Sequence, residues 1–165
     1  MVVLLMGVAG SGKTLIGGML ARALNCGFAD ADEFHPAKNI QKMSQGIPLT
    51  DADREPWLQA MRAAIDNWIK SGQSAILGCS ALKQRYRDRL VASPEVKVVY
   101  LKGDPDLIHR RLLERQGHYM KAEMLASQFT DLEEPSEAMI IDISRTPDQI
   151  VSEILERLRL SGSGT

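Results

Sequence analysis

The chain has 165 residues, enough for one domain with a sizeable buried core, and its 20 basic and 21 acidic residues give a formal net charge of −1. This balance provides no global basic field, so we expect no nucleic acid and no membrane among its partners. With two cysteines outside any metal-ligand spacing, and no signal-like or membrane-spanning apolar run, we expect reduced thiols and a cytoplasmic location.

Five short segments are predicted to be strands, with helical segments between them. The predicted strands are residues 2–6, 27–30, 74–79, 96–101 and 139–143. All but the second are continuous apolar runs, which is typical of parallel strands covered on both faces. Parallel strands need helical crossovers, so the order of the segments predicts an α/β protein with a three-layer α/β/α fold and a five-stranded parallel sheet.

A glycine-rich loop follows the first predicted strand and leads into an amphipathic helix. Its sequence, GVAGSGKT at residues 7–14, fits the P-loop pattern G-x-x-x-x-G-K-[ST] in the strand-to-helix context that the pattern requires. Glycines let backbone N–H groups surround a phosphate at the positive end of the helix. Lys13 is predicted to bridge the β- and γ-phosphates of ATP, and Thr14 to bind Mg²⁺. The predicted nucleotide site contains Gly7, Gly10, Ser11, Gly12, Lys13, Thr14 and Leu15.

The P-loop alone leaves the reaction open, because GTPases, ATPase motors and small-molecule kinases share it. The sequence contains no N-K-x-D or T-K-x-D element to read guanine, which argues against a GTPase. No apolar run downstream ends in Asp-Glu, the pattern that would activate a water in a motor. Phosphoryl transfer to a small molecule is therefore the favoured interpretation.

Two aspartates follow the second predicted strand. Because the carboxyl ends of parallel strands share one edge of a sheet, Asp30 and Asp32 are expected to face the P-loop. Asp32 is the candidate for the base that takes the proton of the attacking hydroxyl, and Asp30 for a carboxylate that helps to hold Mg²⁺. The alternative is that both carboxylates belong to a solvated turn at the strand end.

The polar stretch that follows reads as a short helix, a Gly/Pro turn and a long helix beginning near Thr50 or Asp51. Its motifs and three later ones are Asp32-x-x-His35-Pro36, Asn39, Lys42-Met43, Gly46-x-Pro48-Leu49-x-Asp51-x-Asp53-Arg54-x-Pro56-Trp57-Leu58, Cys79-Ser80-Ala81-Leu82-Lys83-x-x-Tyr86-Arg87, His118-Tyr119-Met120, and Leu125-x-Ser127-Gln128-Phe129 with Leu132-Glu133-x-Pro135. Together they closely resemble the gluconokinases of the shikimate-kinase-like group, over about residues 2–158 of the chain. One departure is Ala31, where a glycine is usual in that family.

This resemblance implies an adenylate-kinase-like and shikimate-kinase-like fold with a helical lid, and ATP-dependent phosphorylation of D-gluconate to 6-phospho-D-gluconate. It also implies one kinase domain at 1–160 with the lid at about 109–130, and a homodimer. The composition of residues 161–165 predicts a disordered tail. Two alternatives stay open: a kinase of the same fold for another hydroxy acid such as shikimate, and a nucleotide-binding regulatory module without catalysis.

Gluconate carries one carboxylate and several hydroxyls, so its pocket needs cationic and hydrogen-bonding side chains. The candidates for contact with this substrate are Asp32, His35, Lys42, Arg54, Lys83, Arg87, His118 and Gln128. For His35, a structural role in its turn is the alternative. The expected catalytic set is Lys13, Asp32, Arg54 and Arg115.

The lid and the last loop are expected to complete the nucleotide site. Arg111 and Arg115 lie one helical turn apart, so both can close over the triphosphate and stabilise charge on the transferring oxygens. Gly117 is the candidate hinge. After the fifth strand, Arg145 lies in a loop that resembles the adenine side of these kinases, and the final helix is expected to begin near Pro147.

Overall fold

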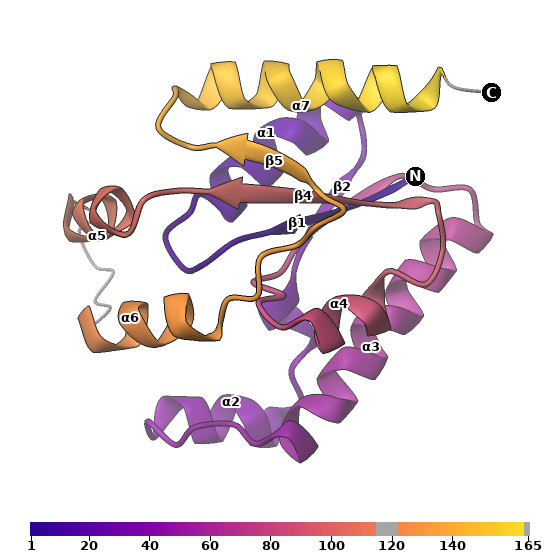
Figure 1. Cartoon of the computed structure of the whole chain (residues 1–165). Helices are drawn as coiled ribbons and strands as arrows, with labels where there is room; N and C mark the ends of the chain where they lie inside the picture. Colours follow the sequence, from indigo (N-terminus) through magenta and orange to yellow (C-terminus); the bar gives the residue numbers. More distant parts are fainter. Residues whose placement is uncertain (115–121, 164–165) are drawn as a thin grey trace.

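The computed structural model describes residues 1–114 and 122–163. Its strands form one parallel sheet in the order β2-β3-β1-β4-β5 (Figure 1). They are β1 (Val2–Met6), β2 (Gly27–Asp30), β3 (Ala75–Gly78), β4 (Val96–Lys102) and β5 (Met139–Asp142). Each predicted strand is present with its ends displaced by no more than one residue, so the predicted α/β class and parallel sheet are confirmed.

Helices connect the strands. They are α1 (Lys13–Leu24), the short 3₁₀ helix η1 (Ala31–Phe34), α2 (Ala37–Ser44), α3 (Asp51–Lys70), α4 (Gln84–Leu90), α5 (Pro105–Glu114), α6 (Ala122–Asp131) and α7 (Pro147–Gly162). Of these, η1, α3 and α7 begin at side-chain caps. Thr50 accepts a hydrogen bond from the backbone N–H of Asp53 at the start of α3, and Thr146 caps α7 in the same way. The predicted starts of both helices are thereby confirmed.

The last helix is longer than predicted. Helix α7 continues to Gly162, two residues into the segment predicted to be a disordered tail. The hydroxyl of Ser161 donates to the carbonyl of Leu158 at 2.9 Å, which supports this final turn. The boundary at residue 160 therefore moves toward the C-terminus.

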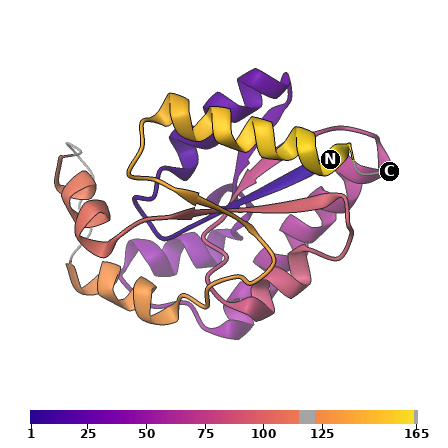
Figure 2. The same cartoon turned by 45° about the horizontal axis from the view of Figure 1, so that its top comes forward.

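The sheet separates two apolar cores, because successive side chains of a strand point to opposite faces. Val3 and Leu5 of β1 are fully buried against α1 and α7, which lie side by side on one face (Figure 2). Val2, Leu4 and Met6 are fully buried on the other face, which α3 covers. Each such side chain contributes roughly 1.5–3 kcal/mol of burial free energy. Burial on both faces explains why the strand is a continuous apolar run.

The carboxyl ends of the strands bring the candidate functional segments to one edge. Asp30, the last residue of β2, is in register with Gly78 at the end of β3, and Gly78 is in register with Leu5 of β1. The P-loop begins directly after Met6. Therefore the P-loop, the η1 segment and the residues that follow β3 meet at the same edge, where α2 extends away from the sheet (Figure 1).

Candidate active site

The P-loop adopts a conformation that only glycine accommodates at two positions. Gly10 has φ +80° and Gly12 has φ +98°, both in the left-handed region. A Cβ atom on Gly10 would lie 2.7 Å from the side chain of Leu112, so a larger residue would also collide with α5. Helix α1 carries no acidic residue in its first turn, which leaves its positive end unneutralised by its own side chains. This geometry fits a phosphate group.

Polar groups of the loop are incompletely satisfied within the chain. The Ser11 side chain is buried, and its hydroxyl oxygen has no hydrogen-bond partner among the described residues. A buried hydroxyl without a partner costs about 1–3 kcal/mol. A loop that leaves such a group without a partner is suited to completion by a bound polar ligand.

Lys13 lies half-buried beneath this loop. Its ammonium donates to the carbonyls of Gly7 at 2.8 Å and Val8 at 3.0 Å. Burial lowers the pKa of Lys13 to about 8, while Cys79, Asp30 and Asp32 act in the opposite direction. The structure thus brings the predicted lysine and both predicted aspartates within electrostatic reach of one another. A polyphosphate bound here would supply negative charge and favour the ammonium form further.

The two aspartates have different local roles. An Asp30 carboxylate oxygen accepts a hydrogen bond from the backbone N–H of Asp32 at 2.9 Å and thereby caps η1. The surrounding atoms desolvate the Asp32 carboxyl and raise its pKa, Asp30 raises it further, and His35 and Lys13 oppose the shift. Asp32 is therefore a stronger base than an ordinary aspartate, as proton abstraction from a hydroxyl requires.

His35 is held against an aromatic side chain. Its ring stacks on Trp57 of α3 with the centroids 4.6 Å apart and the planes 7° from parallel. The Trp57 indole donates to the carbonyl of Ala31 at 2.7 Å, which ties α3 to η1. Trp57, Leu58 and Met61 recur at helical spacing, which by itself predicts only a core position for Trp57. Its position beside His35 is visible only once the two helices are packed.

Lys42, a predicted substrate contact, is engaged with a carboxylate of the protein. Its ammonium donates to Asp53 at 2.8 Å, and that carboxylate also accepts from the backbone N–H of Thr50. The hydrogen bond from Lys42 is the main cause that lowers the pKa of Asp53 to about 2, followed by the one from Thr50. We therefore assign Lys42 a role at the junction between α2 and α3, and its contact with substrate stays a prediction.

Replacing Lys42 with methionine is expected to lower the urea midpoint of unfolding at pH 7. The difference in midpoint between the two proteins should shrink as the pH falls. A carboxylate whose pKa is lowered by folding stabilises the folded state at pH values above its ordinary pKa of 3.8, and it loses this effect as the pH falls toward its folded-state pKa of about 2. Urea titrations of both proteins at pH 7 and about pH 3 test this. Lys38→Met, on the exposed side of α2, is the matched control. An equal deficit at both pH values would contradict the assignment.

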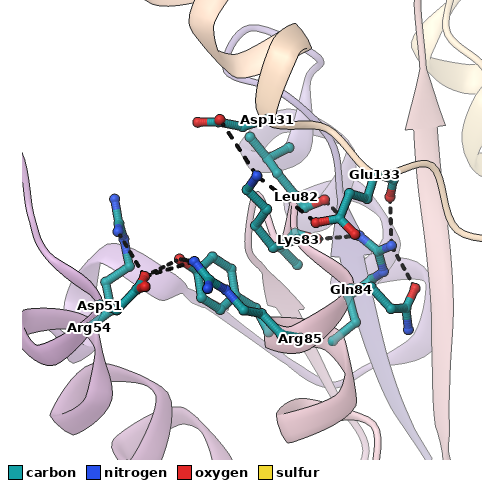
Figure 3. Close-up of polar contacts among 11 residues, drawn as sticks. Asp51, Arg54, Leu82, Lys83, Gln84, Arg85, Asp131 and Glu133 are labelled. Atoms are coloured by element: carbon teal, nitrogen blue, oxygen red, sulfur yellow. Dashed lines mark hydrogen bonds and ion pairs between the residues drawn. The ribbon is translucent and has the colours of Figure 1, made fainter.

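Two other predicted substrate cations lie in looser surroundings (Figure 3). Arg54 is 3.8 Å from Asp51 and lies over the ring of Tyr86, 6.0 Å from its centroid. Lys83 lies between Asp131 at 3.7 Å and Glu133 at 4.0 Å. Exposed ion pairs at such distances contribute little, roughly 0–1 kcal/mol, so an anionic ligand can exchange for them at small cost.

Arg87 has a different role from the one predicted. Its side chain is buried, and its guanidinium donates to four acceptors. These are the carbonyl of Ala81 at 2.7 Å, that of Leu82 at 3.0 Å, the side-chain oxygen of Gln84 at 2.8 Å and the carbonyl of Glu133 at 2.6 Å. Because these acceptors engage both terminal nitrogens, Arg87 ties the segment after β3 to the segment after α6. We assign it a structural role in place of the predicted substrate contact.

Six of the ten predicted nucleotide residues line one pocket beside the P-loop. Its lining includes Gly10, Ser11, Gly12, Leu15, Arg111 and Arg145. Arg145 also forms an ion pair with Glu153 of α7. The end of α5 and the loop between β5 and α7 therefore line the same pocket as the P-loop. Arg115, His118 and the predicted hinge Gly117 lie outside the described residues.

Gln128 contacts the P-loop, and its contact with substrate stays a prediction. Its side-chain oxygen accepts a hydrogen bond from the backbone N–H of Ala9 at 2.6 Å. The two residues are 119 positions apart, so no local pattern in the sequence reports this contact. Helix α6 is thereby coupled to the loop that we expect to hold the phosphates.

Gln128→Ala is expected to raise KM for ATP about threefold to tenfold, because losing one hydrogen bond of roughly 0.5–1.5 kcal/mol leaves the P-loop less ordered. Gln128→Glu should raise it more, since its carboxylate can still accept from Ala9 but places negative charge beside the triphosphate. Steady-state kinetics with each substrate varied in turn measure both effects. A rise in KM for the acceptor with KM for ATP unchanged would instead support the contact predicted from the sequence.

Known proteins with similar sequences and structures include kinases, in agreement with the geometry of the P-loop. The family model described as shikimate kinase matches residues 9–159. The chain is 41% identical over 160 residues to the thermoresistant gluconokinase of Escherichia coli, covering 94% of this chain and 91% of that protein. It is 50% identical over 133 residues to the thermosensitive gluconokinase of the same organism, covering 80% and 71%. A crystal structure of a gluconokinase from Sinorhizobium meliloti aligns with a TM-score of 0.79 and 36% identity, covering 96% of this chain and 95% of that one.

Proposed function

This chain belongs to the shikimate kinase family, its relatives over most of its length are gluconokinases, and we propose that it transfers the γ-phosphoryl group of ATP to D-gluconate. The products are 6-phospho-D-gluconate and ADP. The observation that carries this proposal is the position of a basic carboxylate, Asp32, within electrostatic reach of the P-loop lysine, Lys13. A phosphoryl donor and a hydroxyl acceptor can meet between these two groups.

The nucleotide side of the reaction uses the P-loop and its neighbours. Backbone N–H groups at the start of α1 would bind the phosphates, Lys13 would turn from the loop carbonyls to the β- and γ-phosphates, and the pocket lined by Arg111 and Arg145 would hold the rest of the nucleotide. Mg²⁺, when bound, neutralises charge on the phosphates. The Thr14 hydroxyl and the Asp30 carboxylate are the residues that would hold it.

The acceptor side of the reaction uses the segment after β2. Asp32 takes the proton of the attacking gluconate hydroxyl. The oxygen of this hydroxyl forms the new bond to the γ-phosphorus, while the bond from that phosphorus to the bridging oxygen of ADP breaks. His35, Arg54 and Lys83 would contribute donors that suit the hydroxyls and the carboxylate of gluconate. Arg115 completes the proposed catalytic set as a second cation on the transferring oxygens.

Two further proposals concern the protein in its cell. The near-neutral charge balance and the two free cysteines support a cytoplasmic enzyme. In the described part of the chain, no helix has the length and hydrophobicity needed to cross a bilayer. The homodimer implied by the family resemblance stays a prediction, and light scattering coupled to size-exclusion chromatography tests it.

The function is tested by ADP release from Mg·ATP with D-gluconate, shikimate, glycerate, glucose or no acceptor. We expect turnover with gluconate and a rate near the no-acceptor background with the others. Turnover with shikimate or glycerate alone would support a kinase and would contradict gluconate as its substrate. Absence of turnover with every acceptor, together with tight ATP binding, would favour the regulatory module.

A further inference from the structure

A buried amide lies behind the proposed acceptor side of the site. Asn39, on α2, is fully buried. Its side-chain nitrogen lies 2.8 Å from the backbone carbonyl oxygen of Asp53 and 3.2 Å from Nδ1 of His35. One nitrogen therefore serves both neighbours.

The carbonyl of Asp53 determines which way the Asn39 amide faces. A backbone carbonyl can only accept a hydrogen bond, so the amide atom 2.8 Å from it must be the nitrogen. The opposite orientation would bring two oxygens to that distance. In the observed orientation the amide oxygen of Asn39 is buried and has no partner among the described residues. A buried amide oxygen without a partner costs free energy, but in this orientation both hydrogens of the Asn39 amide have acceptors.

The orientation of the amide in turn determines where the proton of His35 resides. One Asn39 N–H points to Asp53, and the second points to Nδ1 of His35, which must present a lone pair. A neutral imidazole then carries its hydrogen on Nε2. Stacking on Trp57 holds the plane of the ring, and a half-turn of the ring would place a C–H group opposite the Asn39 N–H.

The charges around His35 are compatible with a neutral ring. Burial lowers the pKa of His35, the Arg54 guanidinium lowers it further, and the Asp32 carboxylate acts in the opposite direction. Protonation would also require Nδ1 to give up the hydrogen bond from Asn39, because an imidazolium has no lone pair to offer.

We propose that Asn39 is a positioning residue that fixes His35 as the neutral Nε2–H tautomer, so that His35 donates a hydrogen bond to an oxygen of the acceptor and takes no proton from it. The substrate half of this statement rests on the proposed function, whereas the tautomer does not. The arrangement divides the work of the site. Asp32 removes the proton, and His35 selects an acceptor that presents an oxygen lone pair at the matching position.

The tautomer is measured directly by long-range ¹H–¹⁵N NMR of the imidazole nitrogens in the ligand-free protein. The chain has three histidines, and His35→Phe identifies the signals of His35 by their loss. We expect the pattern of a neutral ring with its hydrogen on Nε2 at pH 7. A hydrogen on Nδ1, or a doubly protonated ring, would overturn the proposal, and this outcome requires no variant of Asn39 to fold.

Asn39→Asp tests the cause. A carboxylate at this position accepts from Nδ1 instead of donating to it, so the hydrogen of His35 should move to Nδ1 or the ring should become doubly protonated. An unchanged Nε2–H pattern in the folded variant would overturn the role of Asn39.

The substrate half is tested with the same signals and with kinetics. Addition of gluconate to the wild-type protein should shift the Nε2–H signal without changing the tautomer. His35→Phe, which keeps the stacking surface against Trp57 and removes both nitrogens, should raise KM for gluconate at least about tenfold with KM for ATP within about twofold. Unchanged KM for gluconate would overturn this half alone. Failure of the acceptor panel with gluconate would overturn the function and leave the tautomer result intact.

Discussion

Replacing Asp32 with asparagine is expected to lower kcat with gluconate by about 10²–10⁴-fold, the range that general-base catalysis usually contributes. Asparagine retains the size of the side chain and the backbone N–H that Asp30 caps. It cannot accept the proton of the attacking hydroxyl at neutral pH. The P-loop and Lys13 remain in place, so the Kd of Mg·ATP should change by less than about threefold.

Steady-state ADP release and calorimetric titration with Mg·ATP measure the two quantities separately. Glu33→Gln is the matched control, because it makes the same chemical change on the next residue of η1, and glutamine can still accept from the backbone N–H of Asp30. Its kcat should stay within about twofold of the wild type. A parallel loss of turnover and ATP binding in Asp32→Asn would show that Asp32 supports the nucleotide site and not proton transfer.

Arg87→Met is expected to lower the free energy of unfolding by about 3–5 kcal/mol, because each hydrogen bond to a charged group contributes roughly 1.5–3 kcal/mol and several are lost together. Three backbone carbonyls and the amide oxygen of Gln84 lose their donor at once. Ala81, whose carbonyl Arg87 engages, has φ +44°, an uncommon value for a residue with a side chain. Arg87 therefore stabilises a segment that is intrinsically disfavoured.

Urea unfolding followed by circular dichroism provides this free energy. Arg85→Met, two positions earlier on α4, is the control: Arg85 is exposed and pairs with Asp51, so its loss should cost less than about 1 kcal/mol. Arg87→Lys should lose most of the stability too, because one ammonium cannot reproduce the fork that spans several acceptors. Wild-type stability in Arg87→Met with a large rise in KM for gluconate would restore the substrate contact predicted from the sequence.

The fold and the chemical class of this protein follow from local patterns in its amino-acid sequence. Continuous apolar runs are dictated by burial on both faces of a parallel sheet, and each predicted strand is present. Local capping at Thr50 and Thr146 starts two helices where the pattern predicted them. The P-loop is a contiguous motif whose backbone geometry its own glycines specify, so Lys13 could be identified without neighbours. Each of these patterns lies within a short contiguous stretch of the chain, so it can be recognised without knowledge of the tertiary structure.

The contacts of the polar side chains in the site depend on how distant segments pack in the folded chain. The sequence predicts substrate contacts for Lys42, Arg87 and Gln128. In the structure Lys42 contacts Asp53, Arg87 contacts a cluster of backbone carbonyls, and Gln128 contacts the P-loop. The sequence could not separate these outcomes, because a guanidinium or an amide satisfies a substrate oxygen and a carbonyl from a distant segment with the same chemistry.

The role of Asn39 also could not be predicted from the sequence. Its residue type predicts little, since asparagine serves turns, caps and cores alike. Packing of α2 against the start of α3 brings its single nitrogen to Asp53 and His35 together. Hydrogen bonding depends on distances of about 3 Å between groups that the chain places far apart, and only the folded packing of helices on the sheet determines those distances.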